Sequence, residues 1–319
     1  MALIDHLETL TEAHYRGDDE MFDASLARLA RLVADNGRTQ DAELIAALAR
    51  EPQRLAEGCP SVTVGSYFAC SLPNIPFDHL VVSHEVRTKL ERLLEEYRQR
   101  AELSRLGLSN RRCILLEGVP GSGKTMTASV IASELGRPLF SARSLDLLHK
   151  CQNKTAEELQ QLLVSIGSQP GVYLIEEFDK VASRGSELED VERLRMILGS
   201  FMRFLEESSP DSIIIAVTHD ASMLDSNLLR CFDDVLTYDL PTTDEALRII
   251  RQTVGPDVDC ENMAILAEKA SLLCQADIVR VCNEAVKTKL LTGAPLSMEE
   301  LSGLFDERLD VYIDHRVVS

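Results

Sequence analysis

Residues 118–125 read Gly-Val-Pro-Gly-Ser-Gly-Lys-Thr and match the pattern G-x-x-x-x-G-K-[ST] in full. The stretch follows an apolar run at 113–116 and opens a helix, which is the context that the pattern requires. Glycines let backbone N–H groups approach phosphate oxygens, the lysine neutralises terminal phosphates, and the threonine hydroxyl can coordinate Mg²⁺. The sequence therefore predicts a nucleotide-phosphate site formed by Gly118, Val119, Pro120, Gly121, Ser122, Gly123, Lys124, Thr125 and Met126.

A second apolar run ends in acids, in the stretch Val-Tyr-Leu-Ile-Glu-Glu-Phe-Asp at 172–179. In phosphoryl transfer one carboxylate helps to hold Mg²⁺, and another orients and partly deprotonates the attacking water. We assign the metal role to Glu176, together with Thr125, and the water-activating role to Glu177. Lys124 is expected to serve catalysis as well as binding. ATP or ADP and Mg²⁺ are the expected cofactors.

The order of apolar patterns predicts the fold class. Short runs at 113–116, 172–175 and 213–217 alternate with amphipathic stretches, which favours an α/β fold with a parallel sheet covered by helices. After Pro241 only helical patterns follow. The expected domains are an N-terminal helical module at 1–57, a Gly- and Pro-rich linker at 58–76, a nucleotide-binding αβα core at 77–242 and a helical lid at 243–319.

Composition narrows the choice of partners and location. The formal net charge of −19 repels phosphate backbones, so nucleic acid is an unfavourable main partner. The eight cysteines include no C-x-x-C pair, which indicates neither a zinc site nor a disulfide framework. No apolar run is long enough to cross a bilayer, so a soluble protein without a membrane partner, located in the cytoplasm, is expected.

Further motifs carry a family resemblance. Three further motifs are Ala-Val-Thr-His at 216–219, Leu-Leu-Arg-Cys-Phe-Asp at 228–233 and Ala-Asp-Ile at 276–278. Together with the phosphate loop at 118–125 and the acidic strand end at 172–179, they resemble the AAA clade of AAA+ ATPases over residues 77–309. The chain is most similar in layout to single-ring bacterial members with a small helical N-terminal region. The resemblance implies a P-loop NTPase core, a four-helix lid and a homo-oligomeric ring, generally a hexamer, with ATP between subunits.

The resemblance also implies roles for three residues. His219 stands where the family senses the γ-phosphate with Asn, and Arg230 stands where a neighbouring subunit receives an arginine finger. Arg280 stands where some AAA+ branches contact the γ-phosphate from the lid, although a surface arginine on an amphipathic helix is at least as good a reading.

Several positions depart from the family pattern. Glu176 replaces the usual Asp beside Mg²⁺, His219 can titrate near neutral pH where Asn cannot, and Arg230 lacks its usual second arginine. The pore-loop step falls on Cys151-Gln152-Asn153, which holds no aromatic residue, and this weakens an interpretation as a polypeptide-threading unfoldase.

Two functions from different classes stay open at this point. The first is an ATP-driven machine that remodels or regulates a protein partner, with residues 1–57 as the docking module. The second is a nucleotide-gated switch with weak or no hydrolysis that organises a complex with a separately encoded effector enzyme. A small-molecule kinase fits less well, because residues 224–233 and the lid match intersubunit functions.

Overall fold

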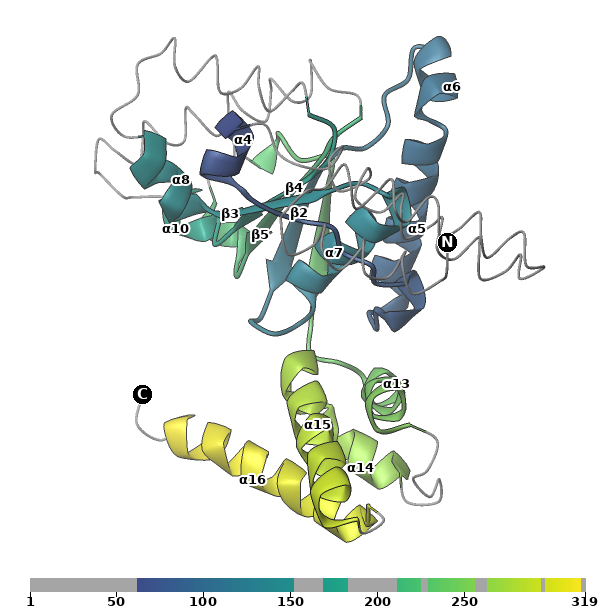
Figure 1. Cartoon of the computed structure of the whole chain (residues 1–319), viewed down its shortest axis with the longest axis vertical. Helices are drawn as coiled ribbons and strands as arrows, with labels where there is room; N and C mark the ends of the chain where they lie inside the picture. The colour runs from purple at the N-terminus through teal and green to yellow at the C-terminus, as the bar shows by residue number, and fades with distance from the viewer. Residues whose placement is uncertain are drawn as a thin grey trace, which may run out of the picture. The chain divides into compact units, whose positions relative to one another are not determined.

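The computed structural model describes residues 62–151, 169–182, 211–224, 229–255, 263–293 and 296–316 (Figure 1). The predicted N-terminal module at 1–57 lies outside these residues, as do Gln152 and Asn153 of the predicted pore-loop step.

The centre of the described chain is a six-stranded sheet with the order β1-β3-β4-β5-β2-β6. β2 is parallel to β5 and β6, β3 is parallel to β4, and β4 is parallel to β5, while β1 joins the edge of β3 in the antiparallel sense. The predicted α/β class with a parallel sheet is confirmed. The strands are β1 (Ala69–Ser71), β2 (Cys113–Gly118), β3 (Leu139–Arg143), β4 (Val172–Glu176), β5 (Ile213–Thr218) and β6 (Asp234–Tyr238).

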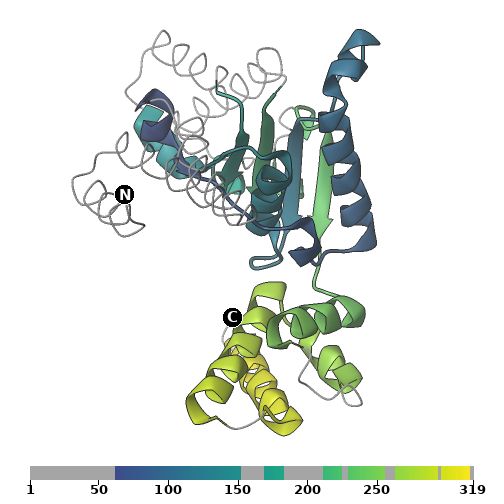
Figure 2. The same ribbon diagram turned by 45° about the vertical axis from the view of Figure 1, so that its right-hand side comes forward.

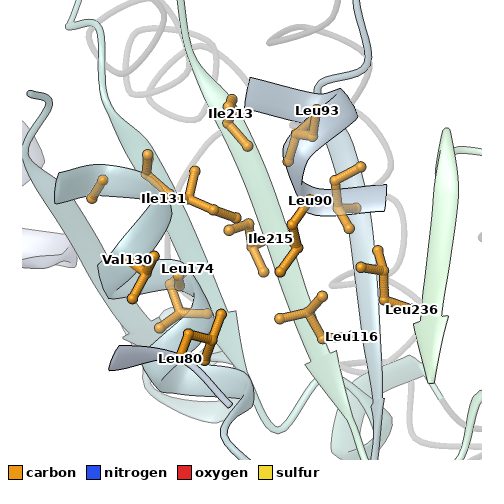
Figure 3. Close-up of a cluster of buried hydrophobic side chains, with 14 of the residues drawn as sticks. Leu80, Leu90, Leu93, Leu116, Val130, Ile131, Leu174, Ile213, Ile215 and Leu236 are labelled. Atoms are coloured by element: carbon orange, nitrogen blue, oxygen red, sulfur yellow. The ribbon is translucent and has the colours of Figure 1, made fainter. Parts of the chain in front are cut away.

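Both faces of this sheet are buried. Successive side chains of a strand point to opposite faces, so Leu115 and Tyr173 join one apolar cluster, while Leu116 and Leu174 join another. Figure 3 shows the second cluster, where Leu116, Leu174 and Ile215 of the sheet meet side chains from the helices that cover it. Burial on both faces explains why these strands read as continuous apolar runs rather than alternating ones.

Helices cover each face of the sheet and make a three-layer αβα core (Figures 1 and 2). α5 (His84–Arg98) and α7 (Lys124–Leu135) contribute to the second cluster, and the Ser83 hydroxyl caps α5 by accepting from the N–H of Val86. α4 (Val62–Tyr67) and α8 (Ser144–Cys151) contribute to the first. The remaining short core helices are η1 (Phe77–His79), α6 (Arg100–Arg105), α10 (Asp179–Ala182) and η2 (Ala221–Met223).

The range expected as a linker holds structure of its own. α4 and β1 fall within 58–76, and Val64 and Phe68 are buried in the core. The Gly, Pro and Ser content of this range masked these few apolar residues, because a short helix and a short edge strand provide little periodicity. β1 pairs Cys70 with Phe140 at the sheet edge, so this segment completes the core.

Residues after β6 form a helical unit around its own apolar cluster (Figure 2). A capping box starts the first helix: the Thr242 hydroxyl accepts from the N–H of Glu245, whose carboxylate accepts from the N–H of Thr242. Ile250, Ile278 and Phe305 are completely buried in the cluster. The helices are α13 (Thr243–Val254), α14 (Met263–Ala270), α15 (Gln275–Thr292) and α16 (Met298–Arg316).

Candidate nucleotide site

A cavity of about 720 Å³ opens at the carboxyl ends of the parallel strands. In the sheet, β3, β4 and β5 lie on one side of β2, and β6 lies on its other side. The direction in which successive strands are added therefore reverses at β2. Open α/β sheets bind ligands at such a reversal, outside the carboxyl ends of the strands. The phosphate loop that follows β2 lies here, and Pro120, Gly121, Gly123, Lys124, Thr125 and Met126 line the cavity.

Glycines allow the phosphate loop to take its shape. Gly118 has φ +139° and lies so close to β6 that a Cβ would stand 2.1 Å from the carbonyl oxygen of Tyr238. Gly123 has φ +98° immediately before α7 begins at Lys124. Positive φ values are easily reached only by glycine, so the loop can present its backbone N–H groups at the start of a helix.

Lys124 is held inside the loop. Its Nζ donates to the carbonyl oxygens of Gly118 and Val119, both at 2.7 Å, and to the Ser122 hydroxyl at 3.3 Å. Burial lowers the pKa of this lysine, and the nearby Asp179 carboxylate acts in the opposite direction. These three acceptors provide the hydrogen bonds that the buried ammonium group needs. Phosphate oxygens would replace them when a nucleotide binds.

Thr125 and Glu176 meet at the position expected for a cation. The Thr125 hydroxyl donates to Glu176 Oε1 at 2.8 Å, and both residues line the cavity. Mg²⁺ binds through hard oxygen atoms, usually with few protein ligands and the rest from phosphates and water. A hydroxyl and a carboxylate in contact fit that requirement. No cluster of three or more His, Cys, Asp or Glu suited to a metal occurs in the part of the chain that the structure describes.

Glu177 has an unusual backbone. Its φ is +57°, the left-handed value that side chains other than glycine rarely adopt, and among the described residues it is the one non-glycine residue with positive φ. The buried Ser144 hydroxyl donates to the Glu177 carbonyl at 2.7 Å. The next residue, Phe178, donates its N–H to the Val217 carbonyl of β5. These bonds to two neighbouring elements hold the turn after β4.

The carboxylate of Glu177 is bound by a cation. Lys180 Nζ lies 2.8 Å from Glu177 Oε2. The hydrogen bond from Lys180 lowers the pKa of Glu177, and the charges of Lys180, Arg143 and His219 act in the same direction. The carboxylate therefore stays ionised to lower pH than an ordinary glutamate and can accept a proton from water only against these neighbours.

The other predicted residues divide into two groups. His219 follows β5 and lines the cavity, and its backbone N–H donates to Asp179 at 3.4 Å. Arg230 and Arg280 are exposed and are not among the described residues that line the cavity. Arg280 Nη1 instead lies 3.8 Å from Asp277 on its own helix. The predicted contact of Arg280 with the γ-phosphate and the predicted finger role of Arg230 both stay predictions.

Residues outside the expected motifs complete the cavity. Leu80, Val81, Ile249 and Val279 form an apolar part of its wall, and Gln275 lines it from the start of α15. The N–H of Ala276 donates to the Gly121 carbonyl at 2.9 Å, so α15 is bonded directly to the phosphate loop. Sequence reasoning missed the apolar wall and Gln275 because these residues come from three segments far apart in the chain and belong to no local motif.

Arg143 and Lys180 also lay outside the expected set. Arg143 ends β3 and lines the cavity beside Glu176, its register partner on β4. The sequence offered a weak signal for β3, since Leu-Phe-Ser-Ala-Arg mixes apolar and polar residues in a short run. Lys180 stands three residues after Glu177 at the start of α10, a spacing that would suggest the pair only once the helix is known.

Comparisons with known proteins identify a family match and several relatives. Residues 114–240 match the ATPase family associated with various cellular activities (AAA). A Sinorhizobium fredii AAA family ATPase is 27% identical over 82% of this chain and 88% of its own length. An ATP-dependent zinc metalloprotease FtsH of Acidimicrobium ferrooxidans is 27% identical, over 77% of this chain and 39% of its own length.

A third relative is the proteasome-activating nucleotidase 1 of Haloferax volcanii, which is 30% identical over 64% of this chain and 54% of its own length. The chain thus spans only part of these two longer relatives. In the described residues no helix is both long enough and apolar enough to cross a membrane. The family match at 114–240 includes the phosphate loop and the acidic end of β4, so this part of the chain is an AAA ATPase domain.

Proposed function

We propose that this protein hydrolyses ATP with Mg²⁺, assembles into a homo-oligomeric ring, and uses the cycle to remodel or regulate a protein partner. The observation that carries the proposal is the 2.8 Å contact between Thr125 and Glu176 in a cavity that Lys124 and Glu177 also line. Under this proposal one chain would supply a phosphate cradle, a cation site and a water-orienting carboxylate, three requirements of phosphoryl transfer.

The residues suggest an order of chemical roles. Lys124 would exchange its loop carbonyl acceptors for phosphate oxygens, and Thr125 and Glu176 would hold Mg²⁺, which neutralises phosphate charge when bound. Glu177 would orient a water and take its proton as the water oxygen attacks the γ-phosphorus. The bond from that phosphorus to the bridging oxygen then breaks, and ADP and phosphate result.

One observation favours the alternative of a nucleotide-gated switch with little hydrolysis. Glu177 pairs with Lys180 at 2.8 Å, and the hydrogen bond from Lys180 lowers the pKa of Glu177, which makes it a weaker base. If the pair persists with ATP bound, the nucleotide would organise a complex with an effector enzyme and turn over slowly. The Lys180 contact is therefore the feature that separates the two functions.

Phosphate release and light-scattering mass, each with and without ATP and Mg²⁺, test the proposal. We expect turnover and assembly for the intact protein, and loss of turnover with assembly retained for Glu177→Gln. Glu284→Gln, which changes a glutamate paired with Lys287 on the lid surface, is the matched control. Turnover that survives in Glu177→Gln would overturn the assigned role, and ATP-dependent assembly without turnover would favour the switch.

Partner and location belong to the same proposal. The proteasome-activating nucleotidase and the FtsH proteases carry names that couple a nucleotide to protein degradation. We extend from them only the class of partner, a protein. We place its docking on residues 1–57 and propose the cytoplasm as the compartment. Substitutions in 1–57 that abolish stimulation by a partner, with basal phosphate release intact, would support this placement.

A further inference from the structure

One positively charged side chain in the cavity wall has no role in the proposed mechanism. The described lining residues include one lysine, Lys124, and one arginine, Arg143. Lys124 belongs to the phosphate loop and has a role. Arg143 has none, although it shares the wall with Glu176 and Glu177.

The sheet fixes where Arg143 stands. β3 and β4 are parallel and pair Arg143 with Glu176, so the arginine leaves the carboxyl end of its strand at the same level as the proposed Mg²⁺ ligand. This is the phosphate end of the cavity, because Thr125 of the phosphate loop contacts Glu176 there. The position follows from strand register and does not depend on a loop conformation.

The guanidinium is weakly engaged. It has an ion pair with Asp146 at 3.9 Å, and the two side chains are 65% and 57% exposed. Exposed pairs of this length contribute little to stability, so a phosphate can displace the carboxylate at small cost. A guanidinium also presents a fork of donors that matches phosphate oxygens, which an ammonium cannot do.

Arg143 shares its cavity with the centre of the proposed reaction. Glu177, the residue assigned to the attacking water, lines the same cavity. Arg230, the predicted finger, is exposed and outside the cavity wall of its own chain. Among the described residues, the arginine available to the site within one chain is therefore Arg143.

We propose that Arg143 binds the terminal phosphate of the ATP held by its own chain, and stabilises the charge that develops when this group passes to water. The inference rests on the proposed function, since it assigns a further residue to the same site. Arg143 would act in cis, and any contribution of Arg230 would come in trans from a neighbouring copy. The site would then distinguish ATP from ADP before assembly.

The first test compares nucleotide affinities, which do not require turnover. In a Glu177→Gln background, we expect Arg143→Gln to weaken ATP binding about ten- to one-hundred-fold, the range for charge-assisted hydrogen bonds, with ADP affinity changed less than about two-fold. Arg143→Lys should restore part of the ATP affinity. Arg98→Gln, which removes an exposed arginine paired with Glu134 away from the cavity, is the control. Equal losses for ATP and ADP, or none for either, would overturn the proposal.

The second test separates action in cis from action in trans. Mixed oligomers of Arg143→Gln and Glu177→Gln subunits should stay inactive, because each site lacks a group that its own chain must supply. Mixing Arg230→Gln with Glu177→Gln should restore some activity if that arginine works across the interface. Restored activity in the Arg143 mixture would contradict action in cis. Failure of the intact protein to hydrolyse ATP would count against the proposed function alone, because the affinity ratio still reports on Arg143.

Discussion

The buried hydroxyl of Ser144 donates a 2.7 Å hydrogen bond to the main-chain carbonyl of Glu177. Ser144 is the first residue of α8, whereas Glu177 follows β4, so the bond ties the turn that carries the proposed water-activating group to the neighbouring αβ unit. Left-handed backbone at a residue with a side chain is strained and persists only when its surroundings hold it. The strand register of β3 and β4 brings that partner into place.

Ser144→Ala should therefore affect both folding and turnover. Loss of one buried hydrogen bond is expected to lower the free energy of unfolding by about 1–2 kcal/mol, and a freer turn should lower kcat with little change in ATP affinity. Denaturant unfolding and phosphate release measure the two effects. Ser222→Ala is a control, since that exposed serine lies on η2 and does not contact Glu177 through any described bond. Wild-type kcat in Ser144→Ala would show that the turn needs no such support.

The pair of Lys180 and Glu177 predicts a change in pH dependence. Lys180 lowers the pKa of Glu177, so the carboxylate of the intact protein remains ionised as pH falls. In Lys180→Met this pKa returns upward, protonation occurs at higher pH, and the acid limb of the kcat profile should move to higher pH. Lys287→Met, which breaks a lysine–glutamate pair of the same spacing on the lid, should leave the limb unchanged. Coincident limbs in both variants would mean that the pair opens before catalysis.

Two glycines should respond to alanine with opposite signs. At Gly118 a Cβ would stand 2.1 Å from the Tyr238 carbonyl oxygen and φ is +139°, so Gly118→Ala should lower the free energy of unfolding by more than about 2 kcal/mol. Gly303 lies inside α16, where a Cβ would have no neighbouring atom within 4 Å, and Gly303→Ala should stabilise by about 0.5–1 kcal/mol. Denaturant unfolding of both variants provides the comparison, and a shift of equal sign would contradict the geometry.

A buried ion pair in the lid should be more important for stability than a surface pair. Arg308 Nε donates to Asp277 Oδ1 at 3.0 Å, and the Asp277 side chain is 5% exposed. Asp277 also accepts from the Cys274 thiol, which lies against the phosphate loop at Gly121. Arg308→Met removes a close cation from this buried carboxylate and should cost roughly 3–5 kcal/mol, whereas Lys287→Met should cost at most about 1 kcal/mol. Similar costs in urea unfolding would refute the distinction.

The sequence by itself determined the phosphate loop, the acidic end of β4 and the parallel α/β class. Each depends on a contiguous run: glycines where the backbone must take positive φ, acids directly after an apolar strand, and apolar residues wherever both faces of a sheet are buried. Such features act over a few neighbouring residues, so their pattern is visible without a partner. The same locality explains why α4 and β1, each short and set among Gly and Pro, read as a linker.

Only the tertiary structure placed Arg143 beside Glu176, Ser144 beneath Glu177, and α15 against the phosphate loop. These contacts follow from the order in which the strands pair and from the packing of the lid helices, which join segments far apart in the chain. No periodicity or motif encodes such a juxtaposition, because burial and register are properties of the assembled sheet. The chemistry of the loop was therefore predictable from its residues, while the groups that tune it became known only from the fold.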